Sequence, residues 1–284
     1  DDSLFLLRKD GVPTVRFLSA IFTGAWMADL GTGQTAIGRT PKMNHPVGFR
    51  LDRGTLTFYD FERKATETFP LQVDELQKSA ERFYVRSGSG VYEVGFTELP
   101  DRTLVTMSLK VADVLPRASR LFEGCVVQSL LGSAYVSLFA RSRAGYQVRV
   151  KELDGVKVLD AKFQAHGATE HGGGLLMVLG ARSGRYCRFV FRFDARFDAY
   201  DVRIVEGVEP GLVNFVVLPH TGVAACLVED DALEVFVATK GKTAVVRRIE
   251  SPLLGSDLRL VRVCDGIGFT RGNELYRLRL GATP

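Results

Sequence analysis

Long apolar runs, cysteine, histidine and tryptophan are all scarce in this chain of 284 residues. No run of 18 or more apolar residues occurs, which excludes a membrane-spanning helix. Four cysteines are too few for a disulfide scaffold, and the two nearest, Cys226 and Cys264, are too far apart to form a zinc-finger pair. We therefore expect no cofactor and no metal ion, and we expect the thiols to be small buried side chains in a reducing compartment.

The chain starts at Asp1 where an initiator methionine would stand, and no charged and then apolar leader precedes the first strand-like segment. We expect a processed chain or one module of a longer one. The few cysteines favour the cytoplasm, while a secreted form whose signal has been removed would begin in the same way. Both localisations stay open from the sequence.

Basic residues gather near the C-terminus. The chain carries 37 Lys+Arg against 33 Asp+Glu, a net charge of +4, and residues 240–284 alone hold nine basic and four acidic side chains. Alternation within two apolar segments predicts a polar strand face bearing Arg259, Arg262, Arg277 and Arg279. Such a face is either solvated or a basic patch that binds phosphates, nucleic acid or an acidic partner.

Alternating and β-branched segments dominate the chain and predict strands. One example is residues 233–237, which with the following 244–249 predicts a hairpin. Asp-Gly pairs at residues 10–11 and 154–155 indicate tight turns. Helical patterns are expected only in two short insertions, Gln72–Arg82 and Val111–Arg120.

The alternating segments recur at a regular interval. Their marks are Trp26, Leu56, Val91, Tyr146, Phe189, Leu233 and Leu275, with spacings of 30, 35, 55, 43, 44 and 42 residues. We attribute the longest interval to the second helical insertion. A repeat of about 40–45 residues with four short strands is typical of a propeller blade.

The chain therefore resembles a divergent seven-bladed β-propeller of the WD-repeat-like kind, although it has no Trp-Asp dipeptide and no Gly-His pair. The predicted fold is all-β, a single domain over residues 1–284. We expect the ring to be closed by Ser3–Leu7 pairing beside Leu275–Leu280, because closure removes exposed strand edges. The competing architecture is a pair of β-sandwiches or barrels that divide near residues 101–120.

Linear catalytic motifs are lacking, so three functions stay open. A propeller presents loops on a rigid frame, which favours a non-catalytic platform that binds proteins or peptides within a larger assembly. A hydrolase or lyase would place its site at the mouth of the channel, without a linear motif. A polyanion binder would use the basic C-terminal segment. The channel-mouth candidates for the enzyme are Glu170, His171, His220 and Asp230.

Overall fold

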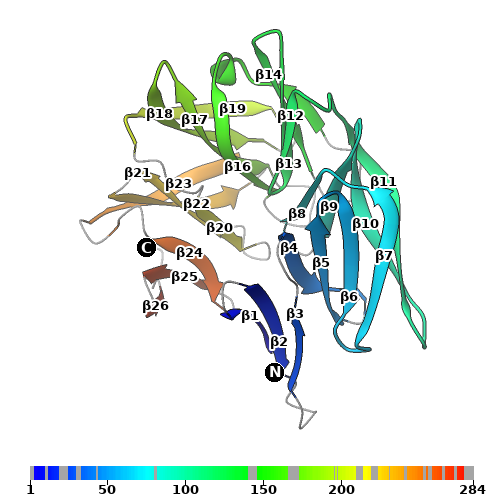
Figure 1. Ribbon diagram of the computed structural model, residues 1–284. Coiled ribbons are helices and arrows are strands. Elements are labelled where there is room, and N and C mark those ends of the chain that lie inside the picture. The colour runs from blue at the N-terminus through cyan, green and yellow to red at the C-terminus, as the bar shows by residue number, and fades with distance from the viewer. Residues whose placement is uncertain are drawn as a thin grey trace. The chain divides into compact units, whose positions relative to one another are not determined.

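The computed structural model consists almost entirely of antiparallel β-strands (Figure 1). Its described part contains 26 strands and one short 3-10 helix, Lys151–Leu153. The all-β fold class is thus confirmed, and no helix of the described residues is long and apolar enough to cross a membrane. The description covers the chain except residues 1–2, 10–11, 19–24, 30–32, 43, 80–81, 140–145, 166–172, 195, 197, 209–213, 219–222, 230, 240–241, 252–253, 255–257, 264–265, 272–273 and 278–284.

The chain divides into two compact units, Asp1–Leu121 and Phe122–Pro284. Among the described residues the first unit holds three sheets, with strand orders β1-β2-β3, β4-β5-β6-β7 and β8-β9-β10-β11. The strands are β1 (Ser3–Lys9), β2 (Val12–Leu18), β3 (Ala25–Asp29), β4 (Gln34–Arg39), β5 (Pro46–Asp52), β6 (Thr55–Asp60), β7 (Ala65–Gln72), β8 (Glu75–Ser79), β9 (Arg82–Ser87), β10 (Gly90–Glu98) and β11 (Thr103–Asp113).

The second unit follows the same plan. Its described residues form four sheets, ordered β12-β13-β14-β15, β16-β17-β18-β19, β20-β21-β22-β23 and β24-β25-β26, with β12 spanning the boundary between the units. The strands are β12 (Ser119–Phe122), β13 (Cys125–Leu130), β14 (Ser133–Leu138), β15 (Tyr146–Arg149), β16 (Lys157–Ala165), β17 (Gly174–Arg182), β18 (Arg185–Phe193), β19 (Ala199–Glu206), β20 (Phe215–Leu218), β21 (Val223–Glu229), β22 (Ala232–Thr239), β23 (Lys242–Glu250), β24 (Arg259–Val263), β25 (Gly266–Arg271) and β26 (Glu274–Arg277).

Tight turns join the second and third strands of several sheets. In three of them both turn residues have positive φ, as a type I′ hairpin requires, and glycine occupies the second position because it adopts this conformation without strain. The pairs are Arg53 (φ 49°) with Gly54 (86°), Leu131 (49°) with Gly132 (82°), and Ser183 (51°) with Gly184 (77°).

Aromatic side chains fill the space between sheets within each unit. In the first unit the Phe49 and Phe83 rings meet edge to face with centroids 4.9 Å apart, and both side chains are fully buried. In the second unit Phe163 and Phe193, on β16 and β18 of one sheet, also meet edge to face, with centroids 6.2 Å apart. Gly174 makes room for Phe163, since a Cβ there would lie 2.3 Å from the ring. The Phe49–Phe83 contact joins two neighbouring sheets, and the Phe163–Phe193 contact packs one face of a single sheet.

A side-chain oxygen at the start of one sheet repeatedly accepts a hydrogen bond from a backbone N–H at the start of the next. We call these contacts inter-sheet clamps. Their sequence separations of 42, 46 and 46 residues match the repeat seen in the sequence. The clamps are Gln34 Oε1 with Leu76 N at 3.0 Å, Glu75 Oε2 with Leu121 N at 2.6 Å, and Asn214 Oδ1 with Leu260 N at 2.8 Å.

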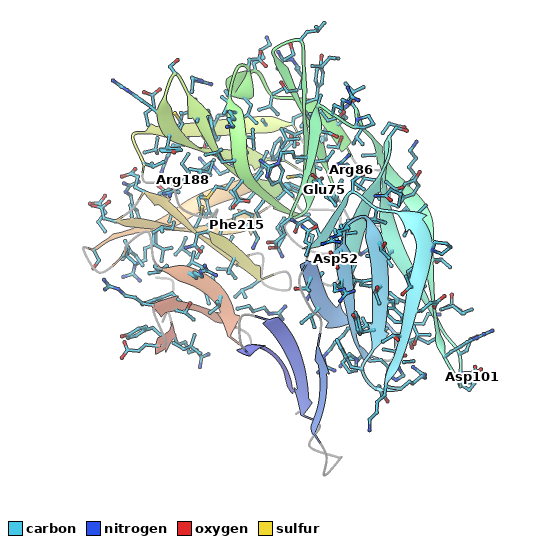
Figure 2. All side chains as sticks on the ribbon, in the orientation of Figure 1. Asp52, Glu75, Arg86, Asp101, Arg188 and Phe215 are labelled. Atoms are coloured by element: carbon cyan, nitrogen blue, oxygen red, sulfur yellow. The ribbon has the colours of Figure 1, made fainter. Side chains whose placement is uncertain are left out.

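The clamp at Glu75 is reinforced by a buried arginine. Arg86 Nε donates to Glu75 Oε2 at 3.0 Å, and Arg86 Nη1 donates to the Pro116 carbonyl at 3.2 Å. Glu75 and Arg86 lie beside each other in the first unit (Figure 2). Because only 8% of Arg86 is exposed, we interpret this ion pair as a structural contact between strands.

Both predicted helical insertions are wrong. Gln72 ends β7, residues 75–79 form β8 and Arg82 begins β9, while residues 111–120 contribute to β11 and β12. Val73 and Leu76 are three apart and both buried, which imitates one face of a helix. Their N–H groups instead bond to the Gly54 carbonyl and to Gln34, so pairing with distant segments overrides the local pattern.

The repeat marks fall on equivalent strands with one exception. Six of the seven lie in the third strand of a sheet, whereas Tyr146 lies in β15, the fourth strand of its sheet. The equivalent strand there is β14, which begins at Ser133, whereas β18 begins at Arg185, so the longest interval falls between β14 and β18, and the only helix among its described residues is the short 3-10 helix. The predicted hairpin at 233–249 is confirmed by the pairing of β22 with β23.

The closure of the ring by the two chain ends stays a prediction, because part of the C-terminal strand lies outside the described residues. β1 pairs with β2, with Lys9 opposite Val12, and belongs to the sheet β1-β2-β3. The sheet of β26 contains β24 and β25, while residues 278–280 lie outside the description.

Candidate functional site

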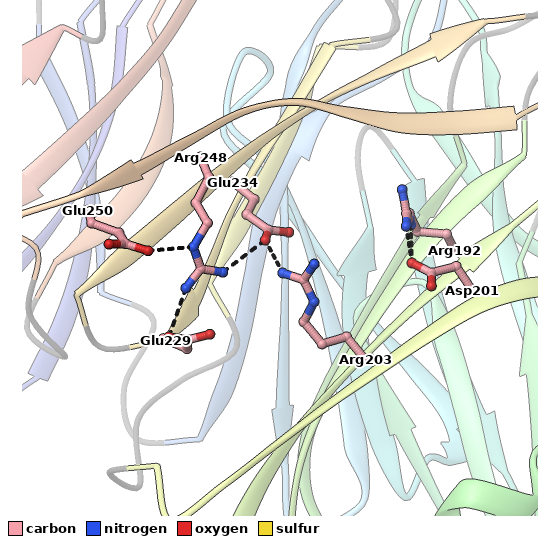
Figure 3. Close-up of polar contacts among 7 residues, drawn as sticks. All are labelled: Arg192, Asp201, Arg203, Glu229, Glu234, Arg248 and Glu250. Carbon is pink, nitrogen blue, oxygen red and sulfur yellow. Dashed lines mark hydrogen bonds and ion pairs between the residues drawn. The ribbon is translucent and has the colours of Figure 1, made fainter.

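A network of arginines and carboxylates links two neighbouring sheets of the second unit (Figure 3). Glu234 on β22 is at its centre. Its Oε1 accepts hydrogen bonds from Arg203 Nη1 on β19 and, at 3.1 Å, from Arg248 Nη1 on β23. The contact therefore joins the outer strand of the β16–β19 sheet to the β20–β23 sheet.

Burial differs sharply across this network. The Glu234 side chain is 3% exposed, whereas those of Arg203 and Arg248 are 38% and 34% exposed. A buried carboxylate needs compensating charge, and the two guanidinium groups provide it from the surface. Each guanidinium group thus binds the buried Glu234 on one side and faces solvent on the other.

Two further carboxylates hold Arg248. Its Nη2 donates to Glu229 at 2.9 Å and its Nε donates to Glu250 at 2.8 Å (Figure 3). Hydrogen bonds to Glu250 and then Glu229 raise the pKa of Arg248 above its ordinary value. All three nitrogens of this guanidinium group are engaged, so its plane is fixed in direction.

A second ion pair lies on the neighbouring sheet. Arg192 on β18 binds Asp201 on β19 with both Nε and Nη2 (Figure 3). Its guanidinium carbon lies 5.9 Å from the centre of the Phe236 ring on β22, a distance at which cations are attracted to aromatic faces. The surface therefore carries three arginines and four carboxylates, a net charge of −1, in alternating positions.

The predicted basic strand face is only partly as expected. Strand register places Arg259 and Arg277 on one face of the β24–β26 sheet, through the pairs Val261 with Gly268 and Gly268 with Arg277. Arg262 pairs with Ile267 and points to the opposite face, so its inclusion in one face is wrong. All three side chains are exposed, and Arg279 lies outside the described residues.

The channel-mouth candidates cannot be placed. Glu170, His171, His220 and Asp230 all lie outside the described residues. Within the described part of the chain, no group of three or more His, Cys, Asp or Glu side chains is arranged to hold a metal ion.

Sequence reasoning missed Glu234, the residue that organises the network. The available signal was a single acidic residue within the run Ala-Leu-Glu-Val-Phe-Val, where both faces of the strand are apolar. A charge in such a run faces the interior on one side or the other. Arg248 lies opposite Glu234 in the predicted hairpin, so strand register could have identified this partner. Arg203 is 31 residues away on another sheet and could not be predicted.

Comparisons with known proteins define the fold. The WD40 domain of coronin from Toxoplasma gondii superposes with a TM-score of 0.53, over 97% of this chain and 77% of that chain, at 8% sequence identity. Hsv2p from Kluyveromyces lactis gives a TM-score of 0.48 at 12% identity, over 91% and 84% of the two chains. No protein-family model and no curated protein matches the sequence. The likeness to the coronin domain shows that this chain has a WD40-like β-propeller fold.

Proposed function

We propose that this protein is a non-catalytic protein-interaction platform, a scaffold subunit that binds a protein partner on its second unit. The observation that carries the proposal is the pair of guanidinium groups of Arg203 and Arg248, both anchored on the buried Glu234 and both more than a third exposed. Arginine is enriched among the residues that dominate binding energy at protein interfaces.

Because the arginine side chains are already anchored, binding a partner costs less conformational entropy. A free arginine side chain loses about 0.5–1.5 kcal/mol of conformational freedom when a partner immobilises it. Here the ion pairs with Glu229, Glu234 and Glu250 have already fixed Arg248. The alternating charges favour a protein partner of matched charge pattern, since a net charge of −1 gives no attraction for a polyanion.

The test removes Arg203 and keeps the fold. In Arg203→Ala the buried Glu234 retains Arg248 as a partner, so unfolding temperature should change little. Arg196→Ala, a change of the same charge on the exposed loop between β18 and β19, is the matched control. A partner would be isolated from the native source by cross-linking and its affinity measured with purified proteins.

We expect cross-links on β19 and β23, at least tenfold weaker binding by Arg203→Ala, and unchanged binding by Arg196→Ala. Equal binding by all three proteins would show that this surface is not the interface. Failure to recover any stoichiometric partner would overturn the scaffold proposal. We also propose that residues 1–284 act as one propeller domain, which the coverage of 97% in the coronin comparison supports.

A further inference from the structure

The tip of the β13–β14 hairpin carries two solvent-exposed leucines. Leu131, the first of the two turn residues, is 99% exposed, and Leu130, the last residue of β13, is 45% exposed. Asparagine or glycine is preferred at the position of Leu131, because its φ of 49° is unfavourable for an aliphatic residue. This sequence therefore places an apolar side chain where both solvation and backbone conformation oppose it.

The tip is held rigidly by the turn that follows β15. Gly155 N donates to the Gly132 carbonyl at 3.2 Å, and Ala134 N donates to Asp154 Oδ1 at 2.9 Å. Arg149 completes the support by binding Ser133 Oγ at 3.2 Å and the Asp154 carboxylate. Leu131 therefore projects from a braced hairpin.

Basic side chains lie on the turn that supports this tip and on the hairpin beside it. Arg182 Nη2 donates to the Glu152 carbonyl, which brings the neighbouring β17–β18 hairpin against the same turn. Five basic residues and three acidic residues lie on the two hairpins, the turn and the strand ends beside them, giving 5 − 3 = +2. They are Arg149, Lys151, Lys157, Arg182 and Arg185 against Glu152, Asp154 and Glu206.

We propose that this tip binds the surface of an anionic lipid bilayer, with Leu130 and Leu131 entering the interface and the basic rim facing lipid headgroups. A short aliphatic tip with nearby Lys and Arg is suited to the boundary between acyl chains and headgroups. A protein pocket is less well matched, since leucine is under-represented among the dominant residues of protein interfaces. This surface is distinct from the arginine network around Glu234, so either proposal can fail without the other.

The test uses the intact chain and vesicles of phosphatidylcholine with or without phosphatidylserine, separated by sedimentation at low and high salt. Leu131→Asn removes the apolar side chain and suits the turn. Ser183→Asn, at the same turn position of the neighbouring hairpin, is the matched control because it changes neither charge nor apolar area.

We expect the unmodified chain to sediment with phosphatidylserine vesicles, and binding to weaken with salt. Leu131→Asn should weaken this binding at least tenfold, corresponding to about 1.4 kcal/mol, while Ser183→Asn and Arg203→Ala should leave it unchanged. The proposal is overturned if the unmodified chain does not sediment, if neutral vesicles bind equally well, or if Leu131→Asn binds normally. Loss of a protein partner in Leu131→Asn without any vesicle binding would assign the tip to a protein instead.

Discussion

The hydroxyl group of Thr103 donates a hydrogen bond of 2.8 Å to Asp60 Oδ2, fastening the start of β11 to the end of β6 within the first unit. Arg63 Nη1 lies 3.0 Å from the same carboxylate oxygen and also donates to Thr103 Oγ1 at 3.0 Å. Asp60 is 1% exposed, so its charge depends entirely on these partners. The three residues form a buried polar link between two sheets.

Replacing Asp60 by alanine should destabilise the protein by about 3–5 kcal/mol, because Arg63 loses its buried counter-charge. Thr103→Val should cost less, about 1–3 kcal/mol, since it removes one hydrogen bond and leaves the ion pair. Urea denaturation would measure both. Asp101→Ala, at an exposed site, is the control and should unfold like the unmodified protein. Equal stability of Asp60→Ala and the control would contradict the link.

Tyr84 should make stability fall at alkaline pH. Burial, and secondarily the nearby Glu93, raises the pKa of Tyr84 from 10.0 to about 12. The unfolded chain therefore loses this proton first, so the contribution is complete below pH 10 and is lost as pH rises through about 12. This difference in pKa corresponds to roughly 3 kcal/mol. Unfolding measured between these limits should show a smaller decline in Tyr84→Phe, and parallel curves would refute the assignment.

The clamp at Asn214 should be worth more than an ordinary surface amide. Its side chain accepts from Leu260 N at 2.8 Å and also donates to the Leu258 carbonyl. Asn214→Ala leaves both backbone groups without this partner and should cost about 1–3 kcal/mol. Gln147→Ala removes an exposed amide of the same unit and should cost under about 0.5 kcal/mol. Guanidinium denaturation with both variants decides whether the clamp stabilises the unit.

Leu131→Asn should stabilise the protein, in contrast to most substitutions. Asparagine tolerates the left-handed conformation of this turn better than leucine, and the exposed side chain of Leu131 contributes no core packing. We expect a gain of about 0.5–1 kcal/mol, visible as a higher unfolding temperature. A lower unfolding temperature would show that Leu131 packs against something in the folded protein.

The sequence predicted architecture well and side-chain relationships poorly. Alternation at Leu233 and Phe189 identified central strands because inward positions repeat every second residue. Helix predictions failed at Val73 and Leu76, where contacts with Gly54 and Gln34 determine the backbone. Arg262 was assigned to the face of Arg259 although three intervening steps reverse its direction. The contact of Arg203 with Glu234 could not be predicted, because it depends on how two neighbouring sheets pack, whereas Arg248 lies opposite Glu234 in a hairpin.

The inter-sheet clamps also bear on how far such a sequence can diverge. Each clamp specifies one side chain, such as Gln34, Glu75 or Asn214, and its partner is a backbone N–H that every residue except proline supplies. Substitution of the residue whose N–H donates therefore preserves the hydrogen bond. Only the acceptor side chain of each clamp requires a particular residue type. A chain built in this way can therefore lose its signature dipeptides while its sheets keep their spacing.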